Sequence, residues 1–245
     1  MPLPARSIRE KLKLFVRLRR GSPSSLPRSI VARMRPAPHH SEPEAARCAV
    51  IDPAAVEAAL AAGADALVFE TPPPPGAIAD LRARRPGLTI YAALDTADDP
   101  SLEGLMAERP HGVLLRDARS GRDVAALGGR LAVCEALAGL DDGATVILAA
   151  IGHPLGVIEA RSFAGASPQL AGLSLDGTAL AASLRQAGAL AQARGLVHLA
   201  AAAAGVAVFE ELTPGEERSP EGLATATPYG FRWVVSRPPA PDGTG

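Results

Sequence analysis

Short apolar runs alternate with longer alanine-rich segments from about residue 46 onward, and this alternation constrains the fold more than any other feature. Continuous apolar runs of this length are typical of strands in parallel sheets, because helices cover both faces of such sheets. We expect strands at Cys48–Ile51, Ala66–Phe69, Leu88–Tyr91, Val113–Leu115, Thr145–Leu148, Leu173–Leu175, Val206–Phe209 and Phe231–Val235. We expect helices at Pro53–Ala62, Pro75–Arg84, Ser101–Glu108, Gly121–Leu137, Val157–Ala164, Thr178–Ala204 and Pro220–Thr227.

Eight strands separated by helices predict an α/β fold, a (β/α)8 TIM barrel over residues 46–238. The main alternative is an open doubly wound sheet, which typically has about five or six strands. No GxGxxG motif follows the first predicted strand, so the barrel is favoured. We expect residues 1–45 to be a basic extension rich in Pro and Ser, and residues 239–245 to be a flexible tail.

The charge of the chain is unevenly distributed. Residues 1–36 contain ten basic residues and one acidic residue, a balance of +9, so the formal −1 of the whole chain leaves −10 for residues 37–245. Both lysines, Lys11 and Lys13, lie in the basic arm. The barrel therefore has no lysine for Schiff-base or P-loop chemistry. The arm is either a solvated tail or a segment that binds an acidic partner such as an acidic protein, a nucleic acid or an anionic lipid.

The two cysteines, Cys48 and Cys134, cannot form a disulfide framework or a four-cysteine zinc site. We expect Cys134 to lie in the core, and we expect a reducing, cytoplasmic location. The longest apolar stretch, Leu196–Phe209, is 14 residues, whereas a membrane span needs about 20. We therefore expect no membrane span. We also expect no secretory signal, because the N-terminus has no long apolar h-region and no small-residue cleavage site.

Polar residues follow most of the predicted strands, and in TIM barrels the chemistry lies at the carboxyl ends of the strands. These residues are Asp52, Glu70, Asp95, Arg116, Asp117, His153, Asp176, Glu210, Glu211 and Arg237. The candidate catalytic residues are His153, Arg116 and Arg237. The candidate substrate-binding residues are Asp52, Asp95 and Asp117.

Glu70 and Asp176 are the candidate metal ligands. Together with His153 they would suit a divalent cation, Mg²⁺ or Mn²⁺, if the fold brings them together. Asp176 is equally compatible with a cap on the helix that follows it, and each strand-end residue also fits an ordinary polar loop. Of the other histidines, His111 is expected in a turn and His198 in the core.

Four segments resemble the HpcH/HpaI aldolase and citrate lyase β-subunit family. They are GADALVFE (63–70), PHGVLLRDARSGRDVAAL (110–127), ILAAIGHPLGVIEARSFAGASPQLAGLSLDGTALAASL (147–184) and YGFRWVVSRP (229–238). The resemblance implies an oligomeric TIM barrel that makes or breaks carbon–carbon bonds in acyl-CoA thioesters or 2-keto acids. It also implies a divalent metal that stabilises an enolate.

The same resemblance shows departures at the positions that carry the family's chemistry. The metal-binding Glu of its fifth strand corresponds to Gly152, and the metal-binding Asp of its sixth strand corresponds to Ala179. The arginine of its third strand falls near Ile90. The lysine after its fourth strand is replaced by Arg116-Asp117. The acidic run after its second strand becomes Glu70-Thr71-Pro72-Pro73, and its C-terminal Gly-Lys and His-Pro pairs become FRWVVSRP.

Three hypotheses follow. The favoured one is a barrel that has lost the metal-dependent chemistry and serves as a binding or structural subunit, in a homo- or hetero-oligomer, with an acyl-CoA or carboxylate as its possible ligand. The second is an active lyase with a relocated site at Glu70, His153 and Asp176. The third is a module that binds an anionic partner through the basic arm.

Overall fold

The computed structural model describes residues 46–51, 53–61, 63–184, 187–212 and 233–236, with only the backbone at 46–51, 187, 210–212 and 233–236. The chain divides into one unit at Met1–Glu42 and a second at Pro43–Gly245, and all described residues belong to the second. The predicted basic extension, the predicted helix at 220–227 and the predicted tail lie outside the described residues.

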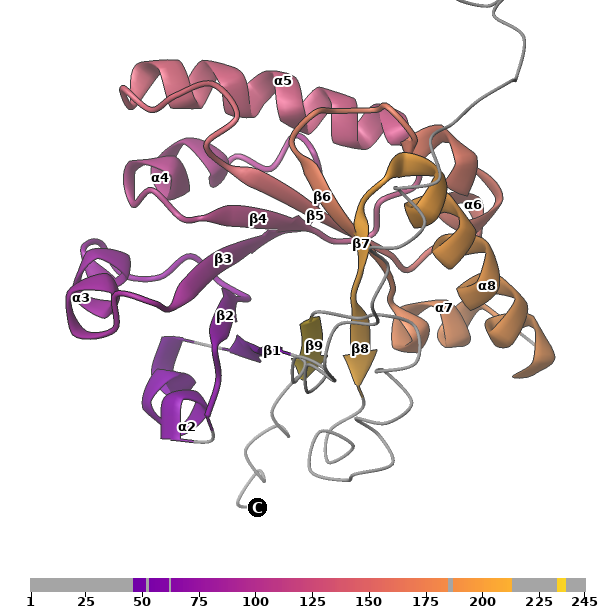
Figure 1. Ribbon diagram of the computed structural model, residues 1–245, viewed down its shortest axis with the longest axis horizontal. Coiled ribbons are helices and arrows are strands. Elements are labelled where there is room, and N and C mark those ends of the chain that lie inside the picture. Colours follow the sequence, from indigo (N-terminus) through magenta and orange to yellow (C-terminus); the bar gives the residue numbers. More distant parts are fainter. Residues whose placement is uncertain (1–45, 52, 62, 185–186, 213–232, 237–245) are drawn as a thin grey trace, which may run out of the picture. The chain divides into compact units, whose positions relative to one another are not determined.

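All the strands in the described part of the chain form a single parallel sheet (Figure 1). They are β1 (Ala46–Ile51), β2 (Ala66–Phe69), β3 (Thr89–Leu94), β4 (Gly112–Leu115), β5 (Val146–Ile151), β6 (Leu170–Leu175), β7 (Ala207–Val208), β8 (Glu210–Leu212) and β9 (Trp233–Ser236). Their order is β7-β6-β5-β4-β3-β2-β1-β9-β8. Only Phe209 separates β7 from β8, so the two ends of this order are continuous in the chain and the sheet closes on itself. The predicted TIM barrel is confirmed.

The helices are η2 (Pro53–Ala55), α2 (Val56–Ala61), α3 (Ala77–Arg84), α4 (Leu102–Ala107), α5 (Gly121–Leu137), α6 (Pro154–Ile158), η3 (Ala160–Phe163), α7 (Gly177–Ser183) and α8 (Ala187–Ala204). The bounds of α5 are those predicted, because the Asp123 carboxylate accepts the Ser120 N–H at 2.9 Å and defines its start. Two predictions need correction. The helix expected at 157–164 begins earlier, at Pro154, and continues as η3, and the helix expected at 178–204 is two helices.

The core has two layers because side chains alternate across each strand. Ala66 and Val68 of β2 belong to the inner cluster of the barrel, whereas Leu67 and Phe69 belong to the cluster between the sheet and the helices. The inner cluster also contains Tyr91, Leu114, Ala150 and Phe209. Cys134 is buried in the outer cluster, as predicted. Burying each large apolar side chain contributes about 1.5–3 kcal/mol.

Among the described helices, none has the length and apolar character needed to cross a membrane.

Candidate functional site

Because side chains alternate along each strand, several of the predicted strand-end residues lie on the inner face of the barrel. Glu70, Asp95 and Arg116 each come two residues after a side chain that packs in the inner cluster. These side chains are Val68, Ala93 and Leu114, respectively. Gly152 and Asp176 follow Ala150 and Ser174 in the same way. These five residues therefore share the inner face at the carboxyl end of the sheet.

Arg116 contacts two of the other predicted residues. Its Nη2 lies 3.2 Å from Glu70 Oε1, and its Nη1 lies 3.7 Å from Asp95 Oδ1. The side chains of Arg116 and Glu70 are each 30% exposed, whereas that of Asp95 is 80% exposed. The contact with Glu70 is the stronger one, because exposed and longer ion pairs contribute little. The arginine faces two carboxylates, so an anionic ligand must compete with both.

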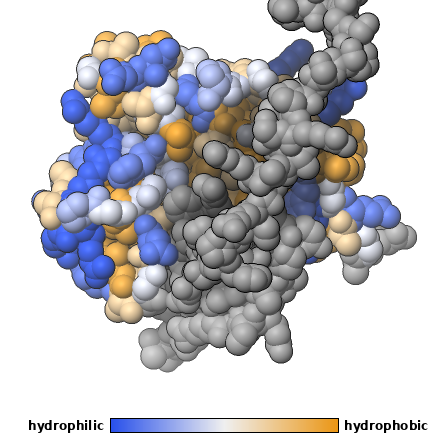
Figure 2. Space-filling view, in the orientation of Figure 1, coloured by the Kyte–Doolittle hydropathy of each residue, from blue (hydrophilic) through white to orange (hydrophobic). Residues whose placement is uncertain are grey.

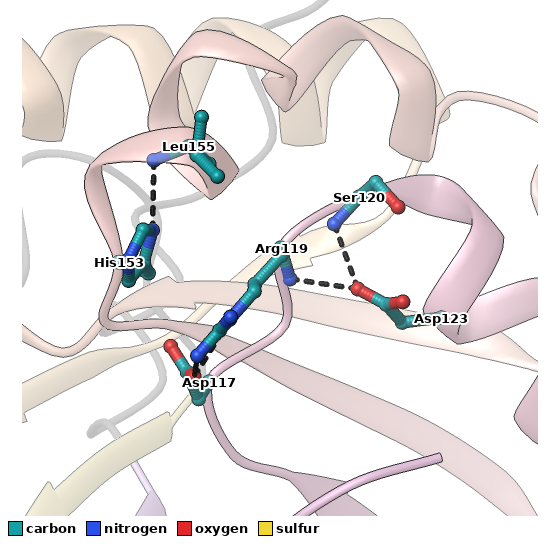
Figure 3. A network of polar contacts seen from close by, with 6 residues as sticks. All are labelled: Asp117, Arg119, Ser120, Asp123, His153 and Leu155. Carbon is teal, nitrogen blue, oxygen red and sulfur yellow. Dashed lines mark hydrogen bonds and ion pairs between the residues drawn. The ribbon is translucent and has the colours of Figure 1, made fainter.

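Asp117 is paired with a neighbour in its own loop. Its Oδ2 accepts hydrogen bonds from Arg119 Nε at 3.0 Å and Arg119 Nη2 at 2.7 Å (Figure 3). Its backbone has a φ of 46°, in the left-handed region that non-glycine residues seldom adopt. The structure thus places this predicted substrate-binding residue in an ion pair with Arg119, separate from the contacts of Arg116.

His153 caps the start of α6. Its Nδ1 accepts the Leu155 N–H at 3.1 Å, and Pro154 occupies the first turn (Figure 3). A capping side chain followed by proline is a common start for a helix. One ring nitrogen of this candidate catalytic residue is therefore engaged in holding the backbone.

Asp176 is also a helix cap. Its Oδ1 accepts the Ala179 N–H at 2.9 Å, which satisfies a free donor at the start of α7. The sequence left open whether Asp176 is a metal ligand or a helix cap, and in the structure it caps α7. The backbone N–H of Asp176 donates to the Ile151 carbonyl at 3.0 Å and joins the ends of β5 and β6.

Gly152 and Ala179 face each other beside Asp176. An ideal Cβ on Gly152 would lie 3.0 Å from the Ala179 Cβ and 3.7 Å from Asp176 Oδ2. These are the two positions to which the resemblance assigns the metal-binding Glu and Asp. Neither residue here has a ligating side chain.

The described side chains do not assemble a cluster of metal-ligating groups. Mg²⁺ prefers carboxylate and carbonyl oxygens in near-octahedral geometry. No group of three His, Cys, Asp or Glu side chains that could hold a metal occurs in the described part of the chain. The predicted set of Glu70, His153 and Asp176 is not assembled there. The side chains of Asp52, Glu210, Glu211 and Arg237 lie outside the description.

Ser174 lies in β6 on the inner face of the barrel, two residues before Asp176. Its side chain is 1% exposed, and its Oγ has no hydrogen-bond partner among the described residues. A buried hydroxyl without a partner costs about 1–3 kcal/mol. Sequence analysis did not identify this residue, because a lone Ser in an apolar strand carries no motif.

Asp99 and Arg130 hold the loop that carries Asp95. The Asp99 carboxylate accepts the Asp95 N–H at 3.1 Å and the Ser101 Oγ–H at 2.6 Å. Arg130 donates to the carbonyls of Ala97 at 2.7 Å and Asp99 at 3.0 Å. Burial raises the pKa of Asp99, but the hydrogen bonds from Ser101 and Asp95 and the charge of Arg130 lower it below its ordinary 3.8. Pro100 follows Asp99 directly, as is common just before a helix.

His111 lies at the amino end of the sheet, opposite the strand ends described above. It was predicted in a turn, and it lies directly before β4, where its Nδ1 accepts the Ile90 N–H at 3.0 Å. Partial burial, and then the charge of Arg82, lower the pKa of His111 below its ordinary 6.5. His198 on α8 has its pKa lowered by burial and by Arg194.

No protein-family model matches the chain, and no curated protein sequence matches it. Solved structures do. An HpcH/HpaI aldolase/citrate lyase family protein from Burkholderia cenocepacia is similar with a TM-score of 0.64 and 17% identity, over 80% of this chain and 88% of that one. An HpcH/HpaI aldolase from Desulfitobacterium hafniense has a TM-score of 0.64 and 12% identity, over 80% and 86%.

Malate synthase of Haloferax volcanii, in a magnesium and glyoxylate complex, has a TM-score of 0.62 and 16% identity, over 81% of this chain and 76% of that one. At these identities the similarity shows the fold. Structures of HpcH/HpaI family proteins are thus among those that share this fold, as the resemblance in the sequence predicted.

Proposed function

We propose that this chain is a divergent barrel of the HpcH/HpaI aldolase and citrate lyase type that binds a small ligand at the carboxyl ends of its strands and no longer performs metal-dependent carbon–carbon lyase chemistry. The observation that carries the proposal is the pair Gly152 and Ala179. They face each other where the resemblance expects two metal-binding carboxylates.

The mutual position of this pair supports the residue correspondence taken from the sequence. Two ligands of one ion must lie close together, and Gly152 and Ala179 do, although 27 positions separate them. Without carboxylates at these two positions, the charge beside them comes from Asp176, whose Oδ2 would lie 3.7 Å from an ideal Cβ on Gly152, whereas hard cations depend on several such oxygens.

The binding role is supported by the polar groups that remain. Arg116 offers a planar fork suited to a carboxylate, although Glu70 and Asp95 now face it. Ser174 supplies a buried hydroxyl on the inner face. We therefore infer a ligand with a carboxylate or thioester group, such as an acyl-CoA or a small carboxylic acid, with Arg116 as its closest polar contact.

Turnover measurements on the full-length chain test the proposal. Turnover of malyl-CoA-type and citramalyl-CoA-type thioesters is measured with Mg²⁺ or Mn²⁺ present, and we expect none above the level of the buffer. The matched variants are Asp176→Asn and His153→Ala. Turnover by the wild-type chain that either variant abolishes would favour the relocated lyase site and contradict the proposal.

A further inference from the structure

The carboxyl end of the barrel, which we call the mouth, has a negative formal charge on its inner face. Among the described residues of this face there are three acidic side chains and one basic side chain, a formal charge of −2. They are Glu70, Asp95, Asp176 and Arg116. A ligand with two carboxylates would bring two further negative charges, and like charges repel. The mouth therefore favours a ligand that has a positive charge as well as a carboxylate.

Asp176 keeps one carboxylate oxygen available for such a charge. Its Oδ1 accepts the Ala179 N–H at 2.9 Å, whereas its Oδ2 has no hydrogen bond or ion pair within the described part of the chain. The residue beside it at the end of β5 is Gly152, which has no side chain to cover the carboxylate. Asp176 is half-buried, so its charge is partly desolvated and still within reach of a ligand.

Ser174 is a second polar group on this side of the mouth that lacks a partner. Its side chain is 1% exposed, and its Oγ makes no hydrogen bond to a described residue. The barrel is filled below it, because an ideal Cβ on Gly172 would lie 3.0 Å from Leu148 Cδ2 and 3.1 Å from Phe209 Cδ1. Ser174 therefore lies at the floor of the mouth, two residues before Asp176. Buried hydroxyls normally have a partner, which indicates that a ligand group supplies one here.

Arg116 points to the other side of the mouth. Its Nη2 and Nη1 lie 3.2 Å and 3.7 Å from the carboxylates of Glu70 and Asp95, which follow β2 and β3. In the closed sheet, β3, β4 and β5 separate β2 from β6 in one direction, and β1, β9 and the continuous β7–β8 segment separate them in the other. The guanidinium thus lies across the mouth from the carboxylate and hydroxyl of β6. A barrel of this size is only wide enough for side chains, so a short molecule can connect the two sides.

We propose that the ligand at the mouth is a small amino carboxylate, whose carboxylate binds Arg116 and whose ammonium binds Asp176 and Ser174. This inference rests on the proposed function, because it takes Arg116 as the carboxylate contact, and it adds the chemical class of the ligand. The two binding groups lie on opposite sides of the mouth. A short chain between ammonium and carboxylate therefore fits better than the adjacent charges of an α-amino acid.

An organic ammonium suits Asp176 and Ser174 better than a metal ion does. Mg²⁺ requires near-octahedral coordination by oxygen atoms. An ammonium group has three N–H donors and is stabilised by a small number of acceptors. Asp176 Oδ2 and Ser174 Oγ are two such acceptors. A zwitterion also adds no net charge to the −2 of the inner face.

Titration calorimetry of the full-length chain with matched probes tests the proposal. The amino carboxylates are β-alanine and 4-aminobutyrate, and the dicarboxylates with the same numbers of methylene groups are succinate and glutarate. We expect at least one amino carboxylate to bind at least about 10-fold more tightly than its matched dicarboxylate. Dicarboxylates that bind as tightly as the amino carboxylates, and lose affinity in Arg116→Gln, would overturn this inference alone. A chain that binds none of the four probes would overturn the proposed function as well.

The variant Asp176→Asn tests the ammonium contact. Asn keeps an acceptor for the Ala179 N–H, so α7 remains capped while the charge is removed. We expect the preference for amino carboxylates to fall about 10-fold. The matched control is Asp80→Asn on α3, an exposed position of the outer surface where hydrophilic residues dominate (Figures 1 and 2). A preference that survives Asp176→Asn, or that falls equally in the control, would contradict the contact.

The variant Ser174→Ala separates a ligand contact from a structural role. We expect the affinity for the amino carboxylate to fall about 5-fold or more, while the stability of the free chain to urea stays equal or rises, because an unpartnered buried hydroxyl is removed. A hydroxyl with a purely structural role would give the opposite pattern. Lower stability with unchanged affinity would overturn the assignment of Ser174.

Discussion

Gly152 and Ala179 lie in direct apposition at the ends of β5 and β6, with an ideal Cβ of the former 3.0 Å from the Cβ of the latter. The first residue follows an inward-facing position of β5, and the second lies in the first turn of α7. Two side chains at these positions would share one small volume. Whether that volume contains two carboxylates or none decides which chemistry this end of the barrel can support.

The variant Gly152→Glu/Ala179→Asp is expected to gain affinity for Mn²⁺ by at least about 10-fold over the wild-type chain, because two adjacent carboxylates form a divalent-cation site. Isothermal titration calorimetry measures it. The control is Gly152→Gln/Ala179→Asn, which has nearly the same volume without the charge. Thermal unfolding of both variants shows whether the crowding at position 152 is tolerated. Equal Mn²⁺ affinity in the two folded variants would be evidence against the correspondence of these positions.

Replacing Glu70 with Gln is expected to raise the affinity for a small carboxylate such as malonate about 10-fold, since Arg116 then loses its closest charged competitor. The matched control is Glu57→Gln, which removes a carboxylate from an exposed pair with Arg84 on the helices. Titration calorimetry with both variants measures the change. Affinity that rises equally in the control, or falls in Glu70→Gln, would contradict a carboxylate-binding role for Arg116.

The lowered pKa of Asp99 predicts loss of stability in acid. The folded chain holds this carboxyl ionised below its ordinary 3.8, so the unfolded chain takes up a proton first as the pH falls. The contribution is fully present above that value and disappears as the pH falls through the folded pKa. Asp99→Asn should cost about 0.5–1.5 kcal/mol at neutral pH and should flatten the acid limb. Urea unfolding across that range measures both, with Asp98→Asn as the neighbouring control.

His111 predicts a second pH dependence, nearer neutrality. Its folded pKa lies below its ordinary 6.5, so the unfolded chain binds a proton before the folded chain does. Stability is therefore fully present above 6.5 and falls as the pH is lowered through and below that value. His111→Asn keeps a neutral acceptor for the Ile90 N–H and should reduce the slope. His198→Asn should also reduce the slope, because the pKa of His198 is lowered in the same direction. An unchanged slope in His111→Asn would contradict this account.

The strands and α5 could be predicted because their signals are local. Apolar runs define the strands, and the Ser120–Asp123 pair marks the start of α5. The break between α7 and α8 was missed because alanine-rich sequence continues a helical pattern through it. The start of α6 was predicted too late, at Val157. His153 caps this helix, and Pro154 is a typical first residue of a helix.

The contacts of the inner face could not be predicted to the same extent. The positions of Glu70, Asp95 and Arg116 just after their strands follow from the sequence, but their pairing depends on the directions of side chains from three strands. The same holds for Glu135, which is fully buried and accepts the N–H groups of Gly143 at 2.9 Å and Thr145 at 2.6 Å. Nothing in a helical LAVCEAL segment indicates that its Glu is buried.

The central claim is that the inner face no longer makes a divalent-cation site, and a Mn²⁺ titration of the wild-type, full-length chain followed by electron paramagnetic resonance tests it most directly. We predict that the signal of free Mn²⁺ stays equal to that of a matched titration of the Asp176→Asn variant. A saturable loss of free signal at one ion per chain, absent from Asp176→Asn, would contradict the claim.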